Sequence, residues 1–337
     1  MNTCTSASIS KPRKNFYIAT MALAIAIAAL FIVSMTKGAA SVSLVDVTND
    51  MDIQTYNIIM YIRLPRTIAG LLSGAALAVS GLLLQTTLNN RLASPGIVGV
   101  NAGAGLFVVA AAILFPAVLQ TKYLAAFAGA LVTVLIIYAI ARKTGATRVT
   151  LLLAGVAVGS LLSAFSDALV TLHPQVLPDK NAFFIGGFAS VSSQSVMWAW
   201  PFIAFGLLIA VLLNRRLDVL ALGDEMAASL GVRVELCRFL SILSAAALAA
   251  GAVSMAGLIG FVGLIVPNLV RMITPGGHRF TIPLAALLGA ALVLFCDILA
   301  RLLFIPYEIP VGILLSVIGA PFFIYILFKK KWSRSYD

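Results

Sequence analysis

Charged side chains are scarce in this chain. Its 337 residues include 23 Lys and Arg and 12 Asp and Glu, or 10%, where a soluble domain carries about 25%. Hydrophobic residues make up 61%, and the mean hydropathy is +1.06. This composition excludes an ordinary soluble domain. It predicts an all-α polytopic membrane protein, because a spanning helix satisfies its own backbone hydrogen bonds.

Residues that catalysis and metal binding require are also few. The three cysteines, Cys4, Cys237 and Cys296, stand far apart and predict neither a disulfide framework nor a metal cluster. Two histidines, His173 and His278, fall on opposite sides of the expected topology, which argues against a membrane-embedded enzyme. No G-x-x-x-x-G-K-[ST] string is present, so the chain lacks a P-loop for nucleotide hydrolysis. We therefore expect no enzymatic activity, no bound cofactor and no metal site.

Ten apolar segments fill most of the length, each long enough or nearly long enough to span a bilayer. They are Phe16–Met35, Arg66–Leu88, Gly96–Phe115, Tyr123–Ala141, Val149–Leu172, Gln194–Leu213, Phe239–Leu258, Phe261–Ile273, Ile282–Leu303 and Val311–Phe328. The third and eighth are the least regular, because glycines and Pro267 interrupt them. The first exceeds the 7–15 apolar residues of a signal peptide, so we expect a retained span.

Basic residues lie between the apolar segments and so report topology. With the N-terminus inside, 17 of the 23 Lys and Arg fall on the inner side and 6 on the outer, as the positive-inside rule predicts. The net charge of +11 therefore does not indicate a nucleic-acid-binding surface, on which the cations would lie together on one solvated face. We expect a cytoplasmic tail (1–15), one transmembrane domain (16–331) with a cytoplasmic loop (214–238), and a second cytoplasmic tail (332–337).

Two outer stretches are longer than a minimal turn. Thr36–Ile62 is expected to be an outer loop, and Asn181–Ser190 a short outer helix or re-entrant segment. On the inner side, Leu220–Val232 (LALGDEMAASLGV) predicts a short amphipathic helix that a glycine ends, with acids in its first turn. It is either an interfacial helix or a docking knob for a cytosolic partner.

Three arginines belong at the outer interface, because each would cost about 2.5–3.5 kcal/mol at the bilayer centre. Arg63 and Arg66 open the second span in the string RLPR. They are either snorkelling anchors or a cationic rim for an acidic partner. Arg301 has a competing explanation, since Asp297 four residues earlier predicts an ion pair within one helix.

Small residues recur every four positions on two spans. Gly155, Gly159, Ser163 and Asp167 follow one face of the fifth span, and Gly312 and Ser316 one face of the tenth. Such stripes usually mark close helix packing, which is also our interpretation of Gly70, Gly74 and Ala78 in the second span. Asp167 is costly against lipid, so its face should meet water, a channel or a polar neighbour.

Several ordered motifs together resemble the FecCD-type permeases of ABC importers for ferric siderophores, haem and cobalamin. They are RLPR (Arg63–Arg66), LASPGIVGVNAGA (Leu92–Ala104), LLLAGVAV (Leu151–Val158), LGDEMAASLGV (Leu222–Val232), GLIGFVGLIVPNLVR (Gly257–Arg271) and IPVGILLSVIGAPFF (Ile309–Phe323). The resemblance covers about Ile62 to Lys331. Two positions depart from the family pattern: Asn268 stands where histidine is common, and Arg91 where proline is common.

The resemblance implies a BtuC-like fold of about ten helices in the bacterial plasma (inner) membrane, with both termini cytoplasmic. It implies a second permease subunit, identical or related, two ATPase subunits that hold ATP and Mg, and an extracytoplasmic substrate-binding protein. A metal chelate would then cross the membrane by alternating access. The chain would contact membrane lipid and would bind no nucleic acid.

The resemblance also assigns a role to each group of residues. The ATPase-coupling residues would be Leu222, Gly223, Asp224, Glu225, Ala228 and Gly231; the binding protein would dock on Arg63, Arg66 and Arg301; the translocation pathway would follow Gly155, Gly159, Ser163, Asp167, Gly312 and Ser316. The alternative is an ion-coupled secondary transporter that uses Asp167 or Asp297, the two acids inside spans.

Overall fold

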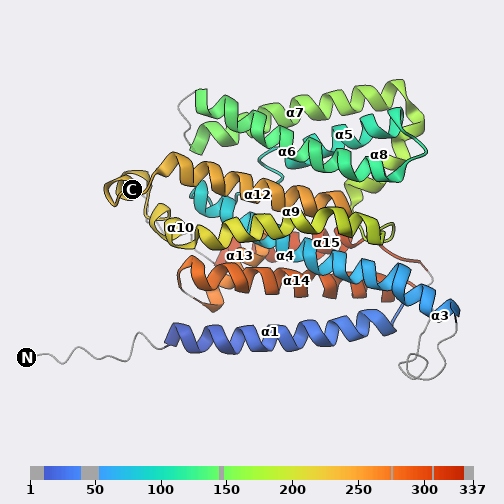
Figure 1. Cartoon of the computed structure of the whole chain (residues 1–337), viewed down its shortest axis with the longest axis horizontal. Coiled ribbons are helices and arrows are strands. Elements are labelled where there is room, and N and C mark those ends of the chain that lie inside the picture. The colour runs from blue at the N-terminus through green and yellow to red at the C-terminus, as the bar shows by residue number, and fades with distance from the viewer. Residues whose placement is uncertain (1–10, 39–52, 144–147, 275, 306, 330–337) are drawn as a thin grey trace, which may run out of the picture.

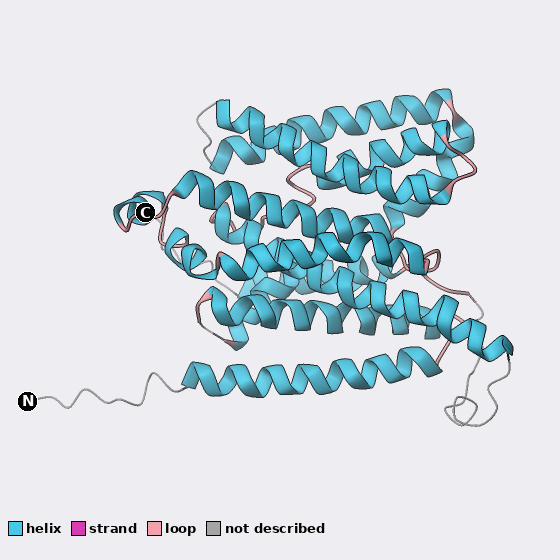
Figure 2. Ribbon diagram, in the orientation of Figure 1, coloured by secondary structure: helices cyan, strands magenta, loops and turns pink. Residues whose placement is uncertain are grey.

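The computed structural model describes residues 11–38, 53–143, 148–274, 276–305 and 307–329, and these contain helices and no strand (Figures 1 and 2). The second predicted tail (332–337) and residues 1–10 of the first therefore lie outside the described residues. The long helices run along one common direction, with α1 on one side of the bundle and α7 on the other (Figure 1). The start of α1 and the short helix α10 lie at the same end, and α3 lies at the opposite end (Figure 1).

Ten apolar helices correspond one to one with the predicted segments. They are α1 (Lys11–Thr36), α4 (Leu64–Thr87), α5 (Val100–Leu114), α6 (Leu119–Lys143), α7 (Arg148–Leu172), α9 (Ser193–Leu212), α12 (Val234–Ala256), α13 (Val262–Ile273), α14 (His278–Leu302) and α15 (Val311–Lys329). Seven are long and apolar enough to cross a membrane, while the apolar stretches of α5, α13 and α15 (Val311–Tyr325) are shorter. The two segments with interrupted patterns are thus among the short helices.

The second span begins earlier than its sequence suggests. Helix α3 (Ile53–Asn57) and the π-helix η1 (Ile58–Arg63) run directly into α4, so the expected outer loop Thr36–Ile62 is helical from Ile53 onward. Pro65 is the second residue of α4, yet the helix continues through it without a break from Ile53 to Thr87. A π-helix has a wider turn, and one directly upstream relieves the clash between a proline ring and the preceding turn.

The remaining short elements lie between spans. Helix α8 (Leu177–Ile185) follows the 3-10 turn η2 (Pro174–Val176), so the predicted outer helix exists but is displaced toward the N-terminus from Asn181–Ser190. The glycine pair after Ile185 explains this end, because Gly186 has φ +69°, outside the helical region. Helices α10 (Asn214–Leu220) and α11 (Asp224–Ser229) form the segment that joins α9 to α12.

Helices α4, α12 and α14 form the buried centre of the bundle, and α4 packs along both of the others. Glycines make the closest approach possible. A Cβ at Gly74 would overlap the carbonyl oxygen of Gly289 in α14, and a Cβ at Gly81 would overlap that of Gly263 in α13. The predicted packing role of Gly74 is therefore confirmed. Gly70 differs, because a Cβ there would meet only Leu294 Cδ1 at 3.9 Å.

Pro267 in the middle of α13 is compensated from a neighbouring helix. A proline cannot donate to the carbonyl four residues earlier, here that of Gly263. Gln85 of α4 donates its side-chain amide to that oxygen at 3.1 Å, and accepts from Arg271 Nη1 at 2.6 Å. The buried carbonyl is thus satisfied by α4, which locks the register of α13 against it.

Replacing Gly74 with alanine should lower the apparent melting temperature of the purified protein in detergent. The added methyl group must push α4 and α14 apart, at a cost of about 1–3 kcal/mol. Gly70→Ala is the matched control one turn away, where the methyl group fits and alanine favours the helix. Equal melting temperatures for the two variants would contradict the tight contact at Gly74.

Candidate functional site

The α10–α11 segment is shaped by two glycines with left-handed backbones. Gly223 has φ +111° directly before α11, and Gly231 has φ +79° directly after its last turn. No atom lies within 4 Å of a Cβ at either position, so conformation rather than space requires glycine there. The predicted short helix with a glycine at its end is therefore confirmed.

This segment presents an apolar surface to its surroundings. Leu222, Met226 and Leu230 are 65%, 56% and 61% exposed, while Ala227 between them is fully buried. Glu225 and Ala228 are exposed beside them. Large apolar side chains exposed together on a segment outside the spans are typical of a surface that contacts either a protein partner or the membrane interface. We call Leu222, Met226 and Leu230 the apolar knob.

The opposite end of α4 carries an ionic cluster. Arg66 donates to Asp297 Oδ1 through Nη2 at 2.9 Å and through Nε at 3.1 Å, and to Glu308 Oε2 at 2.7 Å. Arg301 Nη2 lies 3.2 Å from Asp297 Oδ2 and donates to Ser34 Oγ at 2.7 Å. The cluster therefore joins α1, α4, α14 and the connection before α15. The i,i+4 pairing of Asp297 with Arg301 is confirmed.

The three arginines of this end are internal in the isolated chain. Arg63, Arg66 and Arg301 are 5%, 8% and 4% exposed. Arg63 Nη1 donates to the Met35 carbonyl at 2.5 Å, so it also holds the end of α1. An exposed cationic rim is not what the chain presents, because paired carboxylates and burial leave little of these side chains on the surface. Their docking role stays a prediction.

Some residues of the two small-residue stripes pack against neighbouring backbone, and others are exposed. A Cβ at Gly155 would overlap the Ile97 carbonyl, and one at Gly312 the Ile185 carbonyl, so both glycines permit close backbone contact. A Cβ at Gly159, by contrast, meets only Ala102 Cβ at 3.9 Å.

The polar members of the stripes are more open. Ser163 is half-buried, and Ser316 is exposed and donates to the Gly312 carbonyl at 2.8 Å. Asp167 is exposed and forms an ion pair with Lys180 of α8, so the polar neighbour expected for its face is present. The pathway assignment of these residues stays a prediction.

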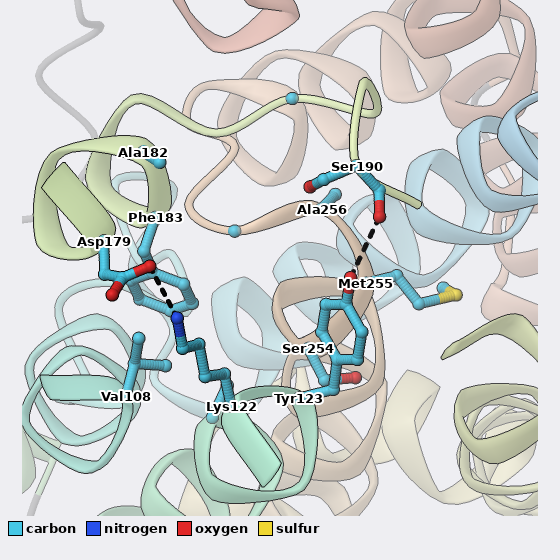
Figure 3. A pocket seen from close by; sticks show the side chains of 13 residues that line it. Val108, Lys122, Tyr123, Asp179, Ala182, Phe183, Ser190, Ser254, Met255 and Ala256 are labelled. Atoms are coloured by element: carbon cyan, nitrogen blue, oxygen red, sulfur yellow. Dashed lines mark hydrogen bonds and ion pairs between the residues drawn. The ribbon is translucent and has the colours of Figure 1, made fainter. Parts of the chain in front are cut away.

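A pocket of about 210 Å³ opens beside α8, between α5, α6 and α12 (Figure 3). Lys122 of α6 forms an ion pair with Asp179 of α8 at 2.6 Å on one side of it. Tyr123 donates its hydroxyl to the Ser190 carbonyl at 2.9 Å on the other side. Sequence reasoning used Lys122 only for topology and missed this fastening, because the paired residues lie 57 and 67 positions apart.

Backbone hydrogen bonds complete the attachment of the segment after α8. Leu258 donates to the Phe183 carbonyl at 2.9 Å and Gly187 to the Ala256 carbonyl at 2.8 Å. Side chains in these connections would collide, since a Cβ at Gly186 would overlap the Leu258 backbone. The glycines therefore hold α8 against the turn between α12 and α13.

Known proteins match this chain over most of its length. The model of the FecCD transport family matches residues 23–329. The chain belongs to the FecCD transport family. Fe(3+)-citrate import system permease protein YfmD of Bacillus subtilis is 39% identical over 300 residues, which cover 88% of this chain and 90% of that protein. Cobalamin import system permease protein BtuC of Halobacterium salinarum is 42% identical over 267 residues, covering 79% and 72%.

A solved structure described as an inward-facing conformation of a metal-chelate type ABC transporter shares the fold, with a TM-score of 0.83. It is 30% identical, and the match covers 92% of this chain and 98% of that one. This FecCD-family chain is therefore a permease subunit of an ABC importer, a multi-pass membrane protein with the fold expected from its motifs. The two departures are tolerated locally: Asn268 donates to the Leu264 carbonyl at 2.8 Å within α13, and Arg91 is exposed.

Removing the shared carboxylate of the ionic cluster should destabilise this FecCD-family permease strongly. Asp297→Ala would leave Arg66 and Arg301 buried without their common partner, at a cost of about 3–5 kcal/mol. Asp167→Ala removes a largely exposed carboxylate in an ion pair and should cost less than about 1 kcal/mol. Thermal unfolding in detergent compares the two variants, and a loss at Asp167 as large as at Asp297 would contradict the buried role.

Proposed function

We propose that this permease passes a ferric siderophore or related metal chelate from an extracytoplasmic binding protein into the cytoplasm by alternating access. Relatives named for ferric citrate, siderophore, hemin and cobalamin import support this class of cargo. ATP hydrolysis on two partner ATPase subunits would supply the energy, and a second permease subunit, identical or related, would complete the pathway. No cofactor bound by this chain is required for that role.

The charge distribution supports a cytoplasmic position for the α10 end. Most Lys and Arg of the sequence fall on that side of the expected topology, and the start of α1 lies at the same end as α10 (Figure 1). The ionic cluster at Arg66 then lies at the extracytoplasmic end. This orientation places the apolar knob where a cytosolic ATPase subunit can reach it.

The observation that carries the proposal is the exposed apolar knob on a chain without a P-loop. A subunit that cannot hydrolyse ATP itself needs a surface through which another subunit moves it. Leu222, Met226 and Leu230 offer apolar contact, and the acids at the start of α11 suit the helix dipole. The short helix is held from behind, because Asp224 forms an ion pair with Arg238 of α12 at 2.7 Å.

Uptake by the purified complex in proteoliposomes tests the proposal directly. The permease is reconstituted with its ATPase subunits and supplied with binding protein and, separately, ferric citrate, a ferric hydroxamate, hemin and cobalamin. We expect one of these compounds to accumulate in the vesicles only when ATP is present on the side that carries the ATPase subunits. Uptake by the chain alone under a proton or sodium gradient would instead establish the secondary transporter that uses Asp167 or Asp297.

A charge in the apolar knob should separate the permease from its ATPase. Met226→Asp places a carboxylate where an apolar contact is expected, and a buried unpaired charge at an interface costs several kcal/mol. We expect co-purification of the ATPase and ATP-dependent uptake to fall together by about tenfold or more. Leu236→Asp, an exposed leucine outside the knob, is the matched control and should retain both.

Arg63 offers a test of binding-protein docking that avoids the ionic cluster. Arg63→Ala should lower the association rate constant of the binding protein and flatten its dependence on salt, because charges act mainly on encounter. Arg142→Ala makes the same charge change at the end of α6 expected to face the cytoplasm, and should leave association unchanged. A fall in melting temperature without any change in association would leave Arg63 a structural residue only.

A further inference from the structure

We propose that Asp218 is a positioning residue through which movement of the α10–α11 segment enters the α4–α14 pair. This rests on the proposed function, since it concerns how ATP hydrolysis elsewhere moves the permease. The inference concerns a contact at the α10 end that sequence reasoning did not find. It joins three elements that the chain brings together from far apart.

Asp218 lies on α10 and binds the first residue of α14 twice. Its Oδ1 accepts from the backbone N–H of His278 at 2.7 Å and lies 2.6 Å from His278 Nδ1. The other ring nitrogen of His278 lies 2.8 Å from the Thr86 hydroxyl in the last turn of α4. One imidazole therefore connects α10, α14 and α4, and its two nitrogens are both engaged.

The start of α14 is built to receive this carboxylate. Its N-cap residue is Gly277, which has no side chain to cap the helix, so Asp218 satisfies a first-turn N–H from another element. A Cβ at position 277 would lie 2.6 Å from Asp218 Oδ2. Glycine is thus the residue that leaves room for the contact, although its backbone (φ −67°) suits any residue.

The charge of Asp218 is retained at neutral pH. Burial raises the pKa of its carboxyl, but hydrogen bonds from the His278 ring and backbone outweigh burial and hold the pKa below the ordinary value of 3.8. A folded-state pKa below the unfolded one contributes stability that is lost only as the pH falls through that folded value. The carboxylate that accepts from the His278 backbone N–H is therefore charged throughout the physiological range.

The rest of α10 packs on the same helices. Leu217 and Leu220 are fully buried, and α10 packs on α14 and α4. Displacing the apolar knob must therefore displace the start of α14. Because α4 and α14 touch at Gly74 and Gly289, and are joined again by Arg66 and Asp297 at the far end, the pair has little freedom to shear.

Two variants break the contact by different routes. Asp218→Ala removes the carboxylate, whereas Gly277→Ala leaves both partners and displaces only the flexible end of Asp218. In the reconstituted full complex, both should lower the amount of chelate imported per ATP hydrolysed by roughly fivefold or more. The double variant should be no worse than Asp218→Ala, because both changes act on one contact.

Glu235→Ala is the matched control, since it removes an exposed carboxylate from the first turn of α12, beside the same segment. It should keep the wild-type ratio of uptake to hydrolysis. The probe is whichever of ferric citrate, ferric hydroxamate, hemin and cobalamin the wild-type complex imports. Assembled variants of Asp218 and Gly277 that also keep this ratio would overturn the inference. Failure of both to assemble would overturn it too, because the contact would then serve folding.

A second measurement does not depend on the cargo. Tyr307 lies beyond the far end of α14 and is 79% exposed. The variant Tyr307→Cys places a reactive thiol there, and Cys4→Ser in the same chain removes a native thiol that could react. The labelling rate of the Tyr307→Cys variant by a membrane-impermeant maleimide should change when ATP and vanadate are added to the complex, and Gly277→Ala should abolish that change. A wild-type complex that responds to ATP but imports none of the chelates would count against the proposed function alone. An unaltered response in Gly277→Ala would count against this inference alone.

Discussion

The contact between α4 and α14 is the constraint on which the rest of the structure depends. Gly74 and Gly289 let the two backbones meet where any side chain would overlap a carbonyl. In an apolar solvent, helix association relies on such packing and on interhelical polar contacts, because lipid provides no hydrophobic drive between helices. Both devices act on this pair, since Arg66 and Asp297 join it at one end and Thr86 and His278 at the other.

Two costly buried groups of this permease are each satisfied by a side chain from a neighbouring helix. The carboxylate of Asp297 is buried between two guanidinium groups, so its charge is paired within the low-dielectric interior. The carbonyl that Pro267 leaves without a donor is supplied by Gln85. The apolar knob differs in position, because its large apolar side chains are exposed on a segment outside the spans. Exposure there is what an obligate partner would remove.

Hydropathy placed all ten apolar helices, because the requirement for a continuous apolar surface is local and repeats along each span. It was less accurate at the ends. The sequence did not predict the helical start at Ile53, because a proline such as Pro65 is typical of a first helical turn. In the structure the π-helix Ile58–Arg63 precedes Pro65 and joins α3 to α4 without a break. The predicted bounds of helix α8 were wrong by several residues. The end of this helix depends on Gly186 and on contacts with the turn between α12 and α13, which no local sequence pattern reports.

The sequence by itself determined the solvent, the number of apolar helices, the family motifs and the short helix at Asp224, since each is written in residues close together along the chain. Only the tertiary structure decided that Arg66 is an internal partner of Asp297, that Gly155 meets the Ile97 carbonyl and Gly312 the Ile185 carbonyl, and that Asp218 reaches His278. The physical reason is distance along the chain: Arg66 and Asp297 are 231 residues apart, and Asp218 and His278 are 60. Their interactions exist only once the helices have packed.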